Sequence, residues 1–207
     1  MKVLSLIVPA YNSEKFLDKC ILSFCDESVL EALDIIIVND GSTDATSAIA
    51  ERYCQLYPNS IRLISQVNKG HGGALNTGFS AAKGKYLKPI DADDWIETQN
   101  LPALIAFLRH CDSDVILTHC NMVDISNGSI TAMKSYPEHY GQPISIDDLM
   151  AQWQNFYQAA TFHSIAYNTA FYQKHNNQLT EHVFYEDHEF ATFPCCHADT
   201  ITPLDIL

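Results

Sequence analysis

Short apolar runs that alternate with amphipathic stretches constrain the fold of this chain most strongly. The apolar runs, which are typical of buried strands, are Val3–Val8, Asp34–Val38, Ile61–Val67, Tyr86–Ile90 and Val115–Cys120. Between them, apolar residues recur at helical spacing and predict one buried stripe per helix. Strands and helices that alternate every ~20–30 residues form βαβ units. The sequence therefore predicts an α/β fold, with a mostly parallel central sheet and helices on both faces.

One of these helices follows Asp44. Its predicted inner face consists of Ala45, Ala48, Ile49, Tyr53 and Leu56. A helix is also expected before the second strand, where Asn12 or Ser13 is placed to cap its first turn. The second strand is continuously apolar, so we expect it in the middle of the sheet.

The pattern of elements loosens after residue 120. The expected elements there are a strand over Ser129–Tyr136, a helix over Ile146–Phe156, a strand over Phe162–Tyr167, a short helix over Thr169–His175 and a helical segment that starts at Tyr185. The sequence contains no internal repeat, linker or low-complexity tract. We therefore predict a single domain over residues 1–207.

The composition excludes several classes of partner. The net charge is −13, from 25 acidic and 12 basic residues, whereas nucleic-acid binding or a basic membrane-docking face requires clustered Lys and Arg. The 7 cysteines form no CxxC pair, which favours reduced thiols and a cytoplasmic protein over a disulfide framework or a zinc site. No apolar run approaches the length of a membrane span.

Three carboxylates, Asp91, Asp93 and Asp94, follow the strand Tyr86–Ile90. Like charges this close repel one another unless a cation neutralises them, and Mg²⁺ or Mn²⁺ prefers oxygen ligands. One interpretation is a metal–diphosphate site. The other is a solvated acidic turn in which one Asp caps the next helix.

Residues at the ends of neighbouring strands favour the metal site. Ligands of open parallel sheets bind beyond the carboxyl ends of the strands. Tyr11 follows the first strand and Asp40 ends the second, so both are expected to line one crevice with Asp91 and Asp93. Ser42 or Thr43 can cap the helix that follows, which leaves Asp40 for a ligand. Within the acidic cluster, Asp94 is predicted to be a helix cap.

The glycine-rich stretch between strands three and four matches neither common nucleotide motif. A dinucleotide fingerprint beginning at Gly70 and Gly72 would need glycine where Leu75 stands, and no GxxxxGK[ST] loop is present. These absences disfavour a Rossmann dehydrogenase and a P-loop enzyme.

Five motifs together carry a family resemblance. They are Ile7–Asn12, Ile36–Asp44, Asn68–Gly78, Asp91–Trp95 and Glu186–Phe190. In this order and at these spacings the chain resembles the family 2 glycosyltransferases, which are inverting, nucleotide-sugar-dependent enzymes with the Rossmann-like GT-A fold. The resemblance covers residues 1 to about 110 closely, and the remainder only through the Glu-Asp pair.

The resemblance implies a role for individual residues. The nucleotide-sugar contacts would come from Pro9, Ala10, Tyr11, Asp40, Asn68, Gly72, Asp91 and Ala92. Asp93 would bind Mn²⁺ or Mg²⁺ on the diphosphate, and Asp187 would be the general base. Glu186, Asp94 and Trp95 would support them. Residues 1–120 would form the nucleotide-sugar-binding half and residues 121–207 the acceptor-side half, which we expect to be truncated at its C-terminal end.

The expected function is transfer of a sugar from a nucleotide-diphospho-sugar, UDP-linked, to a hydroxyl of a glycan or lipid-linked acceptor in bacterial surface polysaccharide or glycan assembly. The expected site of action is the cytoplasm or the inner face of the membrane, with peripheral attachment through missing regions and a homodimer as further expectations. Two alternatives remain open. One is a nucleotide-sugar-binding module without transferase activity, and the other is a sugar nucleotidyltransferase, although the Gly- and Arg-rich loop of such enzymes is absent from Pro9 to Ser13.

Overall fold

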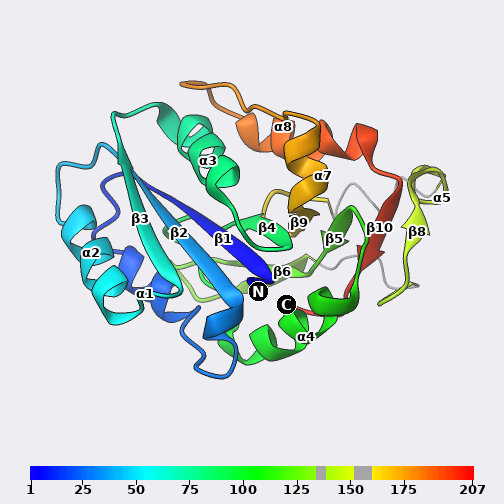
Figure 1. Cartoon of the computed structure of the whole chain (residues 1–207), viewed down its shortest axis with the longest axis horizontal. Coiled ribbons are helices and arrows are strands. Elements are labelled where there is room, and N and C mark those ends of the chain that lie inside the picture. Colours follow the sequence, from blue (N-terminus) through cyan, green and yellow to red (C-terminus); the bar gives the residue numbers. More distant parts are fainter. Residues whose placement is uncertain (134–138, 152–159) are drawn as a thin grey trace.

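A mixed sheet runs through the middle of the molecule and helices lie on both sides of it (Figure 1). The computed structural model describes residues 1–133, 139–151 and 160–207. The strands are β1 (Leu4–Ala10), β2 (Leu33–Asp40), β3 (Ile61–Gln66), β4 (Tyr86–Pro89), β5 (Val115–Leu117), β6 (Cys120–Val123), β7 (Ile130–Met133), β8 (Ile144–Ser145), β9 (Ile165–Asn168) and β10 (Thr200–Pro203). The α-helices are α1 (Leu17–Leu22), α2 (Thr46–Leu56), α3 (Gly70–Ala81), α4 (Leu101–His110), α5 (Ile146–Met150), α7 (Thr169–Lys174) and α8 (Glu186–Thr192). Short 3₁₀ turns cover Leu30–Ala32, Thr98–Asn100 and Pro194–His197.

Among the described residues, the main sheet has 8 strands in the order β3-β2-β1-β4-β9-β5-β10-β8. Strands β3, β2, β1 and β4 are mutually parallel, with Ala10 opposite Asn39 and Asp40 opposite Gln66. This arrangement confirms the predicted α/β class and the mid-sheet position of the second strand. Strands β6 and β7 form a separate hairpin.

Strands from the second half of the chain complete the same sheet. β9 is antiparallel to both of its neighbours, β4 and β5, and β10 is parallel to β5. The strand expected over Phe162–Tyr167 is thus β9, and the short helix expected next to it is α7. Parts of the expected elements Ser129–Tyr136 and Ile146–Phe156 lie outside the described residues.

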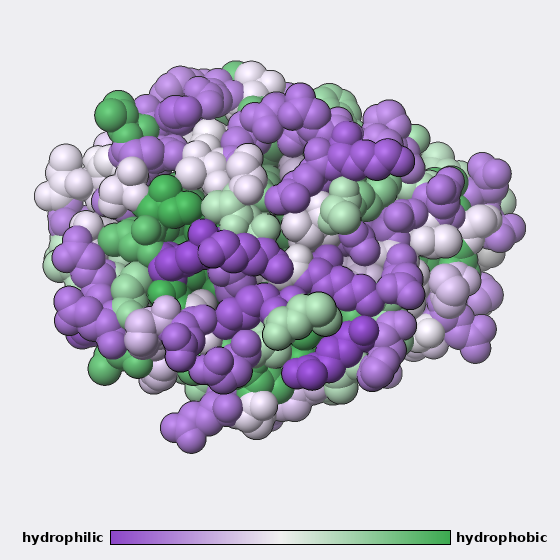
Figure 2. Space-filling model, viewed as in Figure 1, coloured by the Kyte–Doolittle hydropathy of each residue, from purple (hydrophilic) through white to green (hydrophobic). Residues whose placement is uncertain are grey.

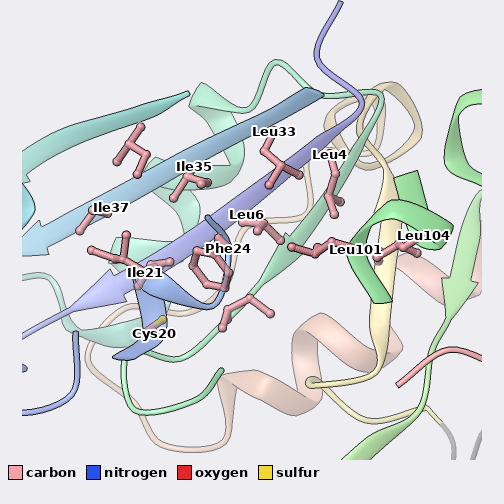
Figure 3. Packing of buried hydrophobic residues seen from close by; sticks show 14 of the residues in the cluster. Leu4, Leu6, Cys20, Ile21, Phe24, Leu33, Ile35, Ile37, Leu101 and Leu104 are labelled. Carbon is pink, nitrogen blue, oxygen red and sulfur yellow. The ribbon is translucent and has the colours of Figure 1, made fainter. Parts of the chain in front are cut away.

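Side-chain alternation along the strands separates two cores. Leu4 and Leu6 of β1, with Leu33, Ile35 and Ile37 of β2, pack against α1, α2 and α4 (Figure 3). Ile7, Ile36 and Val38 point to the other face and pack against α3, α7 and α8. Because successive strand residues point to opposite faces, a continuously apolar strand needs helices on both sides.

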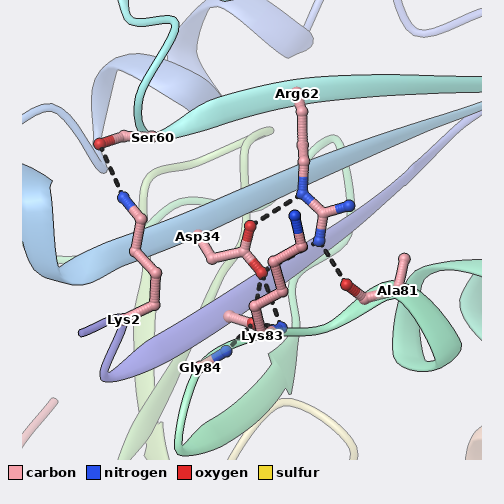
Figure 4. Close-up of polar contacts among 8 residues, drawn as sticks. Lys2, Asp34, Ser60, Arg62, Ala81, Lys83 and Gly84 are labelled. Carbon is pink, nitrogen blue, oxygen red and sulfur yellow. Dashed lines mark hydrogen bonds and ion pairs between the residues drawn. The ribbon is translucent and has the colours of Figure 1, made fainter.

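Asp34 anchors the edge of the sheet where the parallel strands begin (Figure 4). It is buried and accepts hydrogen bonds from Arg62 Nε at 2.9 Å, Ser5 Oγ at 2.7 Å and the Lys83 N–H at 3.0 Å. Arg62 also donates to the carbonyl of Ala81 at the end of α3. This network ties β1, β2, β3 and α3 together.

Polar side chains cover most of the face seen in Figure 2, with small apolar patches between them. None of the helices in the described part of the chain has both the length and the apolar character needed to cross a bilayer.

Candidate donor site

The residues expected to bind a ligand lie at one edge of the sheet. β1 ends at Ala10, β2 at Asp40 and β4 at Pro89, and these strands run in the same direction. Tyr11, just beyond β1, is 55% exposed, whereas Pro9 and Ala10 are buried in the strand. The carboxyl edge of the sheet therefore presents Tyr11 and Asp40 beside the turn that follows β4.

Asp40 is buried and already hydrogen-bonded. Its Oδ1 accepts from Gln66 Nε2 at 2.7 Å and from the Lys69 N–H at 2.9 Å. It does not cap α2, and neither do the expected Ser42 or Thr43, because the N-cap position is Ala45 and no side chain caps the helix. Asp44 Oδ1 accepts the Thr46 N–H at 3.0 Å. Asp40 is thus held in place by the last residue of β3 and by the loop that follows it.

The glycine-rich loop is ordered by its own polar groups. Asn68 donates from Nδ2 to the Asp40 carbonyl at 2.9 Å, and its Oδ1 accepts the Gly70 N–H at 3.2 Å. Gly70 has a φ of +76°, which a residue with a side chain rarely adopts. Gly72 lies against the second half of the chain, since a Cβ there would be 2.5 Å from the Thr180 carbonyl oxygen. Asn68 and Gly72, which were both expected to contact the nucleotide sugar, therefore already contact other parts of the chain.

The acidic turn after β4 contributes to a group that could hold a metal ion. Ligand atoms of Asp91, Asp94 and His163 lie within 4.8 Å of one another. Asp93, the expected ligand, is exposed and lies outside this group, and Ala92 is buried. Carboxylate oxygens with one imidazole nitrogen suit Mn²⁺ and related divalent ions.

The prediction that Asp94 caps a helix is wrong. The next helical turn begins at Thr98, its N-cap position is Glu97, and no side chain caps it. Asp94 instead closes the turn through its N–H to the Asp91 carbonyl at 3.0 Å, and one of its carboxylate oxygens lies 3.6 Å from His163 Nδ1. The caps expected at Asn12 or Ser13 are also absent, because α1 has Phe16 at its N-cap position.

Electrostatics at the turn favour added positive charge. Burial and the charges of Asp91 and Asp93 raise the pKa of Asp94, against the opposing effects of His163 and Lys88. Lys88 is buried behind the turn and donates to the His163 carbonyl at 2.6 Å; its burial lowers its pKa to about 8. A divalent ion would stabilise the ionised form of Asp94, since opposite charge lowers a carboxyl pKa.

His71, in the first turn of α3, links two carboxylates. Its Nε2 lies 2.9 Å from Asp91 Oδ1 and its Nδ1 lies 2.6 Å from Glu186 Oε1. Burial opposes protonation of the imidazole, but the bonds to Asp91 and Glu186 and their charges outweigh it, so the His71 pKa is raised. Two ionised carboxylates can both accept only from a doubly protonated ring.

The expected general base lies beside this bridge. Asp187 is the second residue of α8 and is half-buried, and Glu186, the first residue, is buried. Through Glu186 and His71, the start of α8 is connected to the turn after β4. Trp95, at the far end of that turn, has the Lys19 ammonium 2.9 Å from its ring centroid.

Sequence reasoning missed His71 and His163. His71 falls inside the motif Asn68–Gly78, where a histidine beside glycines is a usable signal for a polar contact. His163 lies in a segment that matches no motif, and it approaches the acidic turn because β9 pairs with β4. No pattern in the sequence of either strand indicates that β9 pairs with β4.

The parallel half-sheet, with an acidic turn at its carboxyl edge and the Glu186–Asp187 pair at the start of α8, matches the GT-A class of nucleotide-sugar enzymes. The family model for glycosyl transferase family 2 matches residues 5–186. The chain belongs to this family, and the resemblance inferred from its five motifs is confirmed.

Relatives and solved structures agree with this assignment. The chain is 38% identical over 117 residues to the putative glycosyltransferase EpsH of Bacillus subtilis (strain 168), an alignment that covers 56% of this chain and 33% of EpsH. It is 30% identical over 152 residues to the glycosyltransferase GlyG of Streptococcus pneumoniae serotype 4 (strain ATCC BAA-334 / TIGR4), covering 73% of this chain and 48% of GlyG. The crystal structure of S. aureus TarS 1-349 in complex with UDP-GlcNAc superimposes with a TM-score of 0.78 and 25% identity, covering 99% of this chain and 56% of TarS 1-349. The chain thus spans about a third of the length of EpsH and about half of the length of GlyG.

Proposed function

We propose that this chain is the donor-binding and catalytic part of a metal-dependent inverting glycosyltransferase. In this proposal it moves a sugar from a UDP-linked donor to a hydroxyl of a glycan or lipid-linked acceptor in surface polysaccharide assembly. The observation that carries the proposal is the contact chain at the sheet edge, in which Asp91, His71 and Glu186 join the acidic turn to the helix bearing Asp187. The crystal structure of TarS in complex with UDP-GlcNAc supports UDP as the nucleotide.

The donor would lie along the carboxyl edge of the sheet. Tyr11 is exposed enough to contact a base, and Asp40 is fixed by Gln66 and Lys69 where it would accept from the uracil. Asp91 would face the ribose and sugar side. Asn68 and Gly72 would act by shaping this edge, since both already have partners within the chain.

Asp91, Asp94 and His163 fit a divalent cation better than Asp93 alone. They supply two carboxylates and one imidazole from two segments, and burial, together with the charges of Asp91 and Asp93, raises the pKa of Asp94. When bound, Mn²⁺ or Mg²⁺ would stabilise the charge that develops on the leaving diphosphate. In a chain with a net charge of −13, few cations are available to do this in its place.

Asp187 would remove the proton from the attacking hydroxyl. Its half-buried position at the start of α8 leaves the carboxylate accessible to an acceptor. The hydroxyl would attack the anomeric carbon opposite the leaving UDP, which inverts that centre. A positioned base contributes roughly 10²–10⁴-fold to such a step.

Asp187→Asn separates transfer from binding. We expect this variant to bind UDP as the wild type does and to lose about 100-fold or more in UDP release from UDP-sugars, because the base is gone while the donor contacts remain. UDP release with water or added glycans as acceptor measures the activity, and calorimetry measures binding. His110→Gln, an exposed substitution at the end of α4, serves as the control.

Two outcomes would contradict this proposal. Undiminished turnover by Asp187→Asn would exclude Asp187 as the base. A wild-type chain that binds UDP but releases none from any UDP-sugar would favour the alternative of a nucleotide-sugar-binding module.

A further inference from the structure

His71 is a side chain that the proposed chemistry does not use, yet it contacts both halves of the site. Its Nε2 bonds to Asp91 Oδ1 at 2.9 Å and its Nδ1 to Glu186 Oε1 at 2.6 Å. Asp91 belongs to the turn after β4, whereas Glu186 begins α8 and precedes Asp187. The imidazole ring also lies against Phe162, with ring centroids 5.8 Å apart, next to His163.

Glu186 depends on this bond for its placement. Its side chain is only 9% exposed, and its bond to His71, at 2.6 Å, is shorter than the bond of His71 to Asp91 at 2.9 Å. A buried carboxylate that loses its partner must find another donor or move toward water, because an uncompensated buried charge is costly. Movement of Glu186 would carry the first turn of α8, and with it Asp187.

The rest of α3 is fastened independently to the segment that leads into α8. Asn76 donates from Nδ2 to the Leu179 carbonyl at 2.8 Å, and its Oδ1 accepts the Leu179 N–H at 2.9 Å. Lys69 lies 3.6 Å from Glu181. α3 is therefore a fixed platform, and His71 is the side chain on it that touches donor-side and base-side carboxylates together.

We infer that His71 is a positioning residue that couples occupation of the donor site to the placement of the base-bearing helix α8. The inference rests on the proposed function, because it assigns Asp91 to the donor and Asp187 to the acceptor hydroxyl. A donor that engages Asp91 would fix the His71 ring from one side, and the ring would hold Glu186 from the other. Coupling of this kind is reciprocal, so a change at Glu186 must also alter donor affinity.

A double-mutant cycle read out by binding tests the coupling. UDP is titrated by calorimetry in the presence of Mn²⁺ into wild type, Glu186→Ala, His71→Gln and the double variant. Gln places an amide near the position of Nε2, so His71→Gln retains a donor for Asp91 and removes the one for Glu186. We expect Glu186→Ala to change the UDP affinity about fivefold or more in the wild-type background and less than about twofold in the His71→Gln background.

Kinetics distinguish positioning from a general loss of structure. His71→Gln is expected to lower kcat for UDP release about tenfold or more and to change the donor KM about as much as Glu186→Ala does, because both variants lose the bond between residue 71 and Glu186. His71→Asn places its amide near Nδ1 instead, retaining Glu186 and releasing Asp91, so it is expected mainly to raise the donor KM. Asn76→Ala loosens the same segment without touching either carboxylate, and its effect on UDP affinity is expected to add to that of Glu186→Ala.

The outcomes separate the two claims. UDP binding with additive effects of the His71→Gln and Glu186→Ala changes would overturn the coupling and leave the proposed function standing. Identical shifts of kcat and KM in His71→Gln and His71→Asn would also overturn the coupling and leave the proposed function standing. A wild-type chain that does not bind UDP would overturn both. Circular dichroism of each variant verifies that it is folded, and either His71 variant suffices for the cycle.

Discussion

Asp34 carries a buried charge at the sheet edge opposite to the candidate donor site. Burial opposes its ionisation, but hydrogen bonds from Arg62, Ser5 and the Lys83 N–H, together with the Arg62 charge, outweigh it and lower the Asp34 pKa below 3.8. A group whose pKa is lower in the folded than in the unfolded state stabilises the fold above its unfolded pKa. This stabilisation is lost as the pH falls through the folded pKa.

Asp34→Asn is therefore expected to lower the free energy of unfolding by about 1–3 kcal/mol at neutral pH, since Arg62 loses a charged acceptor. Urea denaturation from pH 7 downward measures it. The deficit relative to wild type should stay constant above about pH 5 and shrink as the pH falls below 3.8. A deficit that grows with acidity would contradict this account. Asp112→Asn, at an exposed ion pair with Lys85, is the control and should leave the transition unchanged.

Individual site residues were predictable only in part. Asp91 and Asp94 could be placed at the strand end because apolar β4 leads directly into them. Which carboxylate of this turn would belong to the metal-binding group could not be predicted, because that depends on which one faces His163. The structure groups Asp94 rather than Asp93 with that histidine. Asp40 could be placed at the end of β2, but its bonds to Gln66 and Lys69 come from strand register and loop closure.

At the scale of elements, α3 explains why the motif is rich in glycine. Gly→Ala inside a helix ordinarily stabilises by ~0.5–1 kcal/mol. At Gly72, however, a Cβ would lie 2.5 Å from the Thr180 carbonyl oxygen and 3.3 Å from Glu186 Cγ. The close approach of helix and segment therefore requires glycine.

Gly72→Ala is expected to destabilise the fold by about 1–3 kcal/mol and to lower UDP release more than UDP affinity, because the displaced segment leads into α8. Thermal or urea unfolding and calorimetric titration measure these effects. Ser80→Ala, at an exposed position of the same helix, is the matched control and should stay within about 0.5 kcal/mol of wild type. Equal or greater stability of Gly72→Ala would disprove the close packing.

The buried face of α2 shows how well apolar periodicity predicts which side of a helix faces the core. Of the inner face predicted for α2, Tyr53 is buried and Ile49 packs against the core, but Ala45, Ala48 and Leu56 are exposed. Thr46 and Ala50, which were not predicted, are buried. The helix begins at Thr46 and its buried side is rotated from the predicted one. Small residues give a weak hydrophobic signal, so packing against the sheet, rather than local pattern, fixes the rotation.

The α/β class and the parallel arrangement of the first four strands followed from the sequence, because each strand–helix unit is local. The insertion of β9 between β4 and β5 did not follow. It joins residues 86–87 to residues 167–168, and such non-local antiparallel pairing leaves no mark in either segment alone. This pairing places the segment that contains His163 at the carboxyl edge of the sheet, beside the acidic turn.

The dependence of UDP binding on a divalent cation is the decisive property of the proposed donor site. UDP is titrated into the wild-type chain with Mn²⁺ and with a chelator, and then into Asp94→Ala, His163→Ala and Asp93→Ala. We predict that Mn²⁺ strengthens UDP binding about tenfold or more, that Asp94→Ala and His163→Ala abolish this gain, and that Asp93→Ala retains most of it. UDP binding of equal strength with Mn²⁺ and with the chelator, or no UDP binding at all, would contradict a metal-assisted donor site at the carboxyl edge of this sheet.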